Sequence, residues 1–133
     1  MSEQKKKTSK PRVLIVEDEQ LLCDLMARKI QAAGCEVQGV VDGETAFEVV
    51  EKDLPDVILL DLLLPGIDGF EVLRRLKKDE RFQHIPVIVV SNLGEEKDIK
   101  TAMSAGASEY LIKAETSPGK IAEIVLKYAT DKK

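Results

Sequence analysis

The amino-acid sequence predicts an α/β domain with a doubly wound, five-stranded parallel sheet and five helices. Three observations lead to this prediction. Five short apolar runs alternate strictly with segments whose apolar residues recur at helical spacing. The 133 residues suffice for one domain with a proper core, and 44% of them are hydrophobic while 33% are charged. Strict alternation favours a parallel sheet with helices on both faces, because each right-handed crossover needs the length of a helix to return.

Strands are expected where aliphatic and β-branched residues run together. These runs are residues 13–16, 35–41, 56–60, 87–90 and 110–112. The first run is continuously apolar, which suits a strand buried on both faces. The third run ends in Asp61 and is followed by Leu62-Leu63-Leu64-Pro65-Gly66. The chain is thus expected to place a carboxylate at the end of a buried strand and then to turn.

Each strand is followed by an expected helix. The apolar positions at helical spacing are Leu21, Leu22, Leu25, Met26 and Ile30; Ala46, Val49 and Val50; Val72, Leu73 and Leu76; Ile99, Ala102 and Met103; and Ile121, Ile124, Val125 and Tyr128. In the second, third and fourth of these helices the apolar residues are predicted to face the core. Gly34 is expected as the C-terminal cap of the first helix. Asp68 and Glu71 form a capping arrangement, and Ser117 is expected to cap the last helix.

The ends of the chain and its composition limit the possible functions. Residues 1–10 are predicted to be a disordered polar tail, residues 11–130 the domain, and residues 131–133 a C-terminal tail. A net charge of −4 argues against nucleic-acid or anionic-membrane binding through bulk charge, and no apolar run is long enough to cross a membrane. Cys23 and Cys35 lack CxxC spacing and no signal-like segment begins the chain, so a reducing cytoplasm is expected.

Polar side chains follow the predicted strands where each strand ends. Glu17 and Asp18 follow the first strand, Asp61 the third, Ser91 the fourth and Lys113 the fifth. In open parallel sheets, ligands bind at the carboxyl ends of the strands, where the strand order reverses. With the order 2-1-3-4-5, the first and third strands are neighbours. The three carboxylates are therefore expected in one pocket.

These residue types suit phosphoryl transfer. Two unit charges ~4 Å apart at an effective dielectric of 20 repel each other by 4 kcal/mol, and a divalent cation removes that penalty. An all-oxygen site suits Mg²⁺. Lys113 offers a charge and Ser91 a hydroxyl donor to phosphoryl oxygens, with Asp61 as a carboxylate nucleophile. A single carboxylate after one strand is usually a helix cap or a solvated turn, but complementary groups at four strand ends favour the functional interpretation.

The motifs resemble those of one family, the receiver domains of bacterial two-component response regulators. The resemblance runs from about residue 12 to residue 129. It depends on the stretches Ile15-Val16-Glu17-Asp18-Glu19, Asp61 with Leu64-Pro65-Gly66-Ile67-Asp68-Gly69, Pro86-Val87-Ile88-Val89-Val90-Ser91, and Gly106-Ala107-Ser108-Glu109-Tyr110-Leu111-Ile112-Lys113. It implies the flavodoxin-like sheet order given above.

The resemblance also implies a role for each site residue. Asp61 is the expected phosphoacceptor. It would receive the phosphoryl group from a phosphohistidine on a sensor histidine kinase or a phosphotransfer protein. The expected Mg²⁺ ligands are Asp18, Asp61 and the backbone carbonyl of Leu63, with Glu17 acting through water. Lys113 pairs with the phosphoryl oxygens, and Ser91 and Tyr110 form the switch. Phosphorylation would shift the surface of the fourth helix, fifth strand and fifth helix, which contacts a downstream protein.

The sequence departs from the family pattern at two positions, where Ala114 stands in place of a common proline and Asn92 in place of a small residue. Leu63 and Leu93 lie two residues after Asp61 and Ser91, on the route that an attacking water takes in this family. We hypothesise that they slow loss of the phosphoryl group. His84, the only histidine, is expected on the surface, away from the pocket.

The sequence thus predicts a stand-alone receiver, monomeric or dimerising on phosphorylation, that catalyses only its own Mg²⁺-dependent phosphorylation and dephosphorylation. No output domain is expected, so output would pass through a partner protein rather than directly to nucleic acid. One alternative is a receiver-like scaffold that signals without phosphorylation. A second is a phosphatase or nucleotide-binding enzyme, but no glycine-rich phosphate loop follows the first strand.

Overall fold

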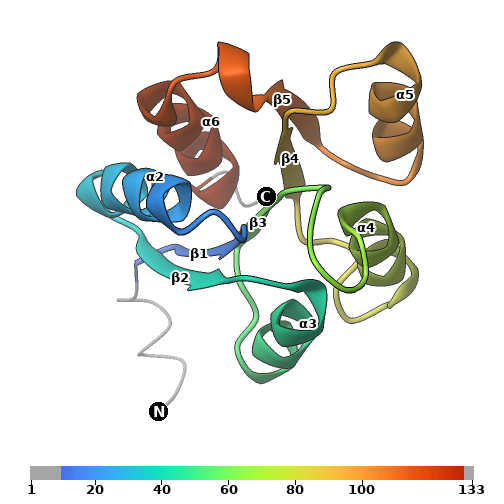
Figure 1. Ribbon diagram of the computed structural model, residues 1–133. Coiled ribbons are helices and arrows are strands. Elements are labelled where there is room, and N and C mark those ends of the chain that lie inside the picture. Colours follow the sequence, from blue (N-terminus) through green and yellow to red (C-terminus); the bar gives the residue numbers. More distant parts are fainter. Residues whose placement is uncertain (1–9, 131–133) are drawn as a thin grey trace.

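The computed structural model describes residues 10–130, and their five strands form one parallel sheet in the order β2-β1-β3-β4-β5 (Figure 1). The strands are β1 (Arg12–Val16), β2 (Glu36–Val40), β3 (Val57–Leu60), β4 (Val87–Ser91) and β5 (Glu109–Ile112). β1 pairs with both β2 and β3, so the strand order reverses there. The predicted order and parallel pairing are confirmed.

Helices cover both faces of the sheet (Figure 1). They are α2 (Gln20–Ala32), α3 (Gly43–Lys52), α4 (Gly69–Lys78), α5 (Glu96–Ser104) and α6 (Pro118–Thr130). A short 3-10 helix, η1 (Lys113–Glu115), directly follows β5 and was not predicted. The cluster of buried residues on one face draws on α2 and α6, and the cluster on the other face draws on α3, α4 and α5.

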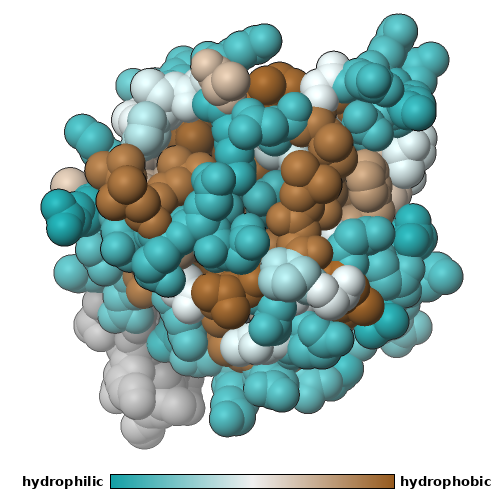
Figure 2. All heavy atoms as spheres, in the orientation of Figure 1, coloured by the Kyte–Doolittle hydropathy of each residue, from teal (hydrophilic) through white to brown (hydrophobic). Residues whose placement is uncertain are grey.

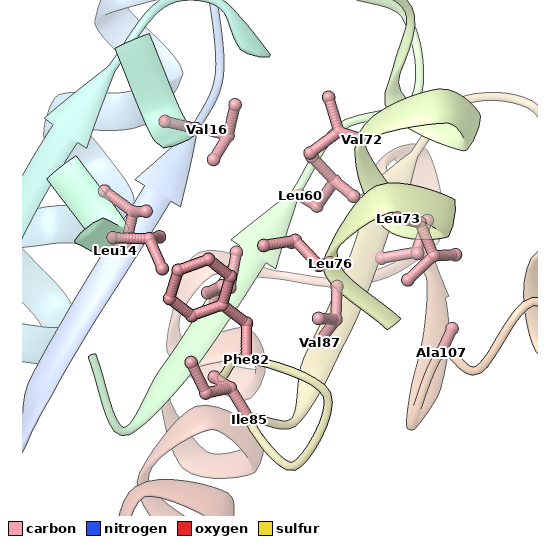
Figure 3. Packing of buried hydrophobic residues seen from close by; sticks show 14 of the residues in the cluster. Leu14, Val16, Leu60, Val72, Leu73, Leu76, Phe82, Ile85, Val87 and Ala107 are labelled. Carbon is pink, nitrogen blue, oxygen red and sulfur yellow. The ribbon is translucent and has the colours of Figure 1, made fainter. Parts of the chain in front are cut away.

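α4 buries one side against the sheet. Val72, Leu73 and Leu76 form the buried stripe of α4, as predicted, and Val72 and Leu76 lie close to Leu60 of β3 (Figure 3). Val57, Ile58, Leu59 and Leu60 of β3 are all fully buried. Burial of such side chains contributes about 1.5–3 kcal/mol each. β3 is therefore held firmly on both faces up to the residue before Asp61.

Side chains also define the helix ends. Asp68 Oδ1 accepts a hydrogen bond from Glu71 N at 3.0 Å, and Ser117 Oγ accepts one from Lys120 N at 3.1 Å, so both predicted caps are confirmed. Asp42 caps α3 in the same way, through Thr45 N at 2.8 Å. Gly34 has a positive φ of 102°, as expected of a left-handed cap.

Not every apolar position of the helical pattern faces the core. Met103 was predicted to point inward, but its side chain is 43% exposed. In α5 only Ala102 is buried, because the helix lies over the short strand β5 near the edge of the sheet. On α2, Leu21 is 75% exposed while Cys23, Met26 and Ile30 are buried. Cys23 is thus a packing residue.

The tails predicted at residues 1–10 and 131–133 lie outside the described residues, except for Lys10. Within residues 10–130, no helix combines the length and the apolar character that a bilayer crossing needs.

Candidate functional site

The carboxyl ends of the central strands bring the predicted polar residues to one edge of the sheet. Asp61 follows β3 and is 4% exposed, and Glu17 follows β1 and is 2% exposed. Their backbones continue the sheet by one residue, because Asp61 N donates to Val16 O at 3.0 Å and Glu17 N donates to Val40 O at 2.9 Å. Both carboxylates are therefore fixed by the strands that carry them.

Three carboxylates meet at this edge. Glu17, Asp18 and Asp61 each offer an oxygen that lies within 4.8 Å of the other two. Glu17 and Asp61 are buried, whereas Asp18 is exposed at the mouth of the site. The structure thus brings together the three acidic residues that the sequence predicts to share a pocket. Their oxygens are the kind of ligand that a hard cation such as Mg²⁺ prefers.

Lys113 supplies the positive charge at the centre of the site. Its Nζ lies 2.9 Å from Asp61 Oδ2 and 3.0 Å from Glu17 Oε1, and Glu19 Oε1 lies further away at 3.8 Å. The lysine follows β5, on the far side of β4 from β3. Its side chain therefore crosses the end of β4 to reach the carboxylates.

Burial and the neighbouring charges have opposite effects on the pKa of Glu17, and likewise on the pKa of Lys113. Burial raises the pKa of Glu17, and the hydrogen bonds from Glu19 N and Lys113 only partly offset it. Burial of Lys113 favours its neutral form, but the hydrogen bonds and charges of Asp61 and Glu17 prevail and raise the pKa of the ammonium group. Lys113 is therefore a permanent cation at neutral pH.

The loop after Asp61 is fixed close to the carboxylate. Asp61 Oδ1 accepts a hydrogen bond from Leu63 N at 3.1 Å, and Gly69 N donates to Leu62 O at 2.9 Å. A Cβ on Gly69 would lie 2.3 Å from Asp61 O, so the start of α4 approaches the acidic site too closely for any larger residue. The Leu63 side chain is 54% exposed at the rim.

Ser91 and Tyr110 meet at the peptide groups of Leu93. The buried Ser91 Oγ accepts a hydrogen bond from Leu93 N at 3.3 Å, and the Tyr110 hydroxyl donates to Leu93 O at 2.5 Å. A residue at the end of β4 and an aromatic residue of β5 are thus joined through one loop. A shift of the Leu93 backbone would therefore affect the hydrogen bonds of both side chains.

One contact of the site was missed at the sequence level. Ala114 N donates to Asn92 Oδ1 at 3.1 Å, which joins the chain after Lys113 to the chain after Ser91. The sequence marks both residues as unusual, but nothing in their spacing shows that they touch. His84 is exposed in the connection before β4, as predicted.

A hollow of about 200 Å³ lies at the opposite edge of the sheet, where β1 and β2 begin. Arg12, Glu36 and Asp53 line it, and Arg12 pairs with Asp53. It holds none of the predicted site residues. The clustered carboxylates and the lysine therefore identify the carboxyl edge of the sheet as the candidate site.

Curated relatives share most of the domain. The chain is 41% identical over 103 residues to the DNA-binding dual master transcriptional regulator RpaA of Synechocystis sp., covering 77% of this chain and 43% of RpaA. It is 41% identical over 102 residues to the response regulator PleD of Caulobacter vibrioides, covering 77% of this chain and 22% of PleD. The chain thus spans less than half the length of these relatives.

Solved structures agree over nearly the whole chain. The receiver domain of the Francisella response regulator 1452 superposes with a TM-score of 0.84 at 25% identity, covering 92% of this chain and 99% of that one. The phosphorylated cyanobacterial phytochrome response regulator RcpA gives a TM-score of 0.79 at 27% identity, covering 91% and 94%. The model of the response regulator receiver domain matches residues 13–125. The chain therefore belongs to the response regulator receiver domain family.

Proposed function

We propose that this protein accepts a phosphoryl group on Asp61 in two-component signalling. The observation that carries the proposal is the buried Asp61 carboxylate, which clusters with Glu17 and Asp18 and lies 2.9 Å from the Lys113 ammonium group. The donor is a phosphohistidine of a sensor histidine kinase or phosphotransfer protein. An Asp61 oxygen forms the new bond to phosphorus, the phosphorus–nitrogen bond breaks, and the electron pair leaves with the imidazole.

The acidic cluster fits Mg²⁺. We assign Asp18, Asp61 and the Leu63 carbonyl as its ligands, with Glu17 acting through water. The cluster's oxygens lie within 4.8 Å of one another, and their shared negative charge is what such a cation neutralises. When bound, Mg²⁺ would supply charge neutralisation for the phosphoryl oxygens. Lys113 would exchange its contact with Asp61 for one with a phosphoryl oxygen.

The Ser91, Leu93 and Tyr110 contacts support a route for the signal. A phosphoryl oxygen on Asp61 would draw the Ser91 hydroxyl toward it, which changes the Leu93 peptide that Tyr110 holds. Leu93 precedes α5, and Tyr110 belongs to β5. The fourth helix, fifth strand and fifth helix of the sequence prediction are α5, β5 and α6 here, and we propose that this surface contacts the downstream protein.

The face shown in Figure 2 supports docking by a protein. Apolar side chains gather there over α2 and near the loop between β3 and α4, with hydrophilic surface between them. Leu21 and Leu25 on α2 and Leu63 in that loop are exposed leucines. Exposed apolar side chains that gather on one face suit contact with a partner protein. Both cysteines are free, which supports a cytoplasmic location.

A direct experiment tests phosphoryl acceptance. The protein is incubated with Mg²⁺ and acetyl phosphate, and intact mass is followed. We expect the wild type to gain one phosphoryl group, Asp61→Asn to gain none, and Asp24→Asn, an exposed acid of α2, to behave as the wild type.

Two outcomes would contradict the proposal. Absence of a mass gain in the wild type would favour the scaffold that signals without phosphorylation. A gain that survives in Asp61→Asn would place the phosphoryl group on another residue.

A further inference from the structure

The chain immediately after Lys113 is tied to the chain immediately after Ser91. Ala114 is the middle residue of η1, and its N–H donates to Asn92 Oδ1 at 3.1 Å. The two residues lie side by side because β4 and β5 are paired in register up to Ser91 and Ile112. The Asn92 side chain therefore bridges two neighbouring loops, each of which begins with a residue of the site.

Apart from the ion pairs of the Lys113 side chain, the other bonds of η1 stay within its own loop. Thr116 Oγ1 donates to Ile112 O at 2.9 Å, and Thr116 N donates to Lys113 O at 3.4 Å. These bonds close the turn but do not position it relative to the carboxylates. The bond to Asn92 does so, because it fixes the peptide next to Lys113 against the end of β4.

We infer that Asn92 is a positioning residue, which acts through the Ala114 backbone to hold Lys113 over Asp61. The inference rests on the proposed function, since it concerns the group that would pair with the phosphoryl oxygens. Lys113 has a long, flexible side chain, and its Nζ lies 2.9 Å from Asp61 Oδ2 and 3.0 Å from Glu17 Oε1. A fixed peptide at the base of that side chain reduces the number of conformations open to it.

The identities of the two residues depend on each other. Asn92 supplies an acceptor without adding a negative charge beside three carboxylates. Ala114 supplies the N–H, which a proline at that position would lack. Each residue is thus suited to this contact only in the presence of the other. The bond thus joins the residue after Ser91 to the residue after Lys113, and Ser91 and Lys113 carry the two groups proposed to contact the phosphoryl oxygens.

The first test is kinetic. Asn92→Ala is compared with the wild type for phosphorylation by acetyl phosphate at saturating Mg²⁺, and the rate is expected to fall about fivefold, as for the loss of one neutral hydrogen bond. The Mg²⁺ concentration for half-maximal rate should stay unchanged, because the carboxylates are not altered. Thr116→Val, which removes a hydrogen bond internal to the loop, is expected to keep the wild-type rate.

A double-mutant cycle identifies the partner. Ala114→Pro removes the donor, so Asn92→Ala should have no further effect in that background. Ala114→Gly keeps the N–H, so Asn92→Ala should still slow the reaction there. An equal effect of Asn92→Ala in the proline and glycine backgrounds would overturn the inference.

Amide exchange measured by NMR checks the bond without any phosphorylation. The Ala114 amide should exchange faster in Asn92→Ala, whereas Asn92→Asp, which retains an acceptor oxygen, should keep the protection. Unchanged exchange in Asn92→Ala would overturn the inference.

If the wild type itself gains no phosphoryl group, the proposed function fails. If the wild type and Asn92→Ala react at the same rate, the inference alone fails.

Discussion

Glu17 is a buried carboxylate whose charge the fold tolerates at a cost. Burial raises its pKa above the usual 4.5, so the folded protein holds the proton on Glu17 more tightly than the unfolded chain does. The stability that this tighter proton binding confers is fully present below the unfolded-state pKa and is lost as pH rises through the folded-state pKa. Without Mg²⁺ at pH 7, we expect Glu17→Gln to be more stable than the wild type by about 1 kcal/mol.

Denaturant unfolding in EDTA at several pH values measures this difference. The advantage of Glu17→Gln should shrink as pH falls toward 4.5. Glu19→Gln, which alters an exposed carboxylate further from Lys113, should show no such pH dependence. A wild type more stable than Glu17→Gln at pH 7 would mean that the ion pair with Lys113 outweighs the desolvation of Glu17.

Leu63 and Leu93 are predicted to control how long the phosphoryl group lasts. Leu63 is exposed beside Asp61, and the half-buried Leu93 follows Ser91. Asparagine at both positions would let water approach more easily, so we expect loss of the phosphoryl group to quicken about tenfold, equivalent to 1.4 kcal/mol in the barrier. Intact mass against time after removal of the donor measures the rate. Leu54→Asn, at an exposed leucine before β3, is the control, and a rate unchanged or slower in the double variant would refute the hypothesis.

The site residues Glu17, Asp61 and Lys113 could be predicted because each directly follows an apolar run that ends at the same edge of the sheet. Their convergence is a consequence of parallel strands. The bond between Asn92 and Ala114 could not be predicted in this way. It depends on how two irregular loops fold, and such loops carry no periodic signal.

At the scale of elements, the close approach of α4 to β3 depends on Gly69. A Cβ there would lie 2.3 Å from Asp61 O and 2.5 Å from the Leu62 Cα, and a backbone cannot yield as a flexible side chain can. We expect Gly69→Ala to lower the free energy of unfolding by about 2 kcal/mol through overpacking. Gly119→Ala in α6, where nothing lies within 4 Å, should be neutral or stabilising. Chemical denaturation of both variants makes the comparison, and equal effects would contradict it.

The helices show where periodicity succeeds and where it fails. Val72, Leu73 and Leu76 face a sheet of several strands, so spacing alone assigned them correctly. Met103 belongs to α5, which lies near the edge of the sheet, and spacing cannot show how much of a helix face the sheet covers. η1 was missed because its three residues are too few to show a pattern.

At the scale of the whole molecule, Mg²⁺ is expected to stabilise the fold. A ligand that binds only the folded state at tenfold its Kd adds about 1.4 kcal/mol to the free energy of unfolding. We expect the unfolding midpoint of the wild type to rise with Mg²⁺ and that of Asp18→Asn to rise much less. Asp24→Asn should respond as the wild type. An equal rise in Asp18→Asn would mean that the metal binds elsewhere.

The two halves of the site are built differently, and this bears on how each half can move. The backbones of Glu17 and Asp61 are held by hydrogen bonds that extend the sheet. Glu17 N donates to Val40 O, and Asp61 N donates to Val16 O. The loop after β4 is joined instead to β5 and to η1 by side-chain bonds, those of Tyr110 and Asn92. The acidic half should therefore open only when the whole sheet unfolds, whereas the half with Ser91 and Lys113 can open locally and much more often. The acceptor thus stays fixed while the groups that respond to it are free to rearrange.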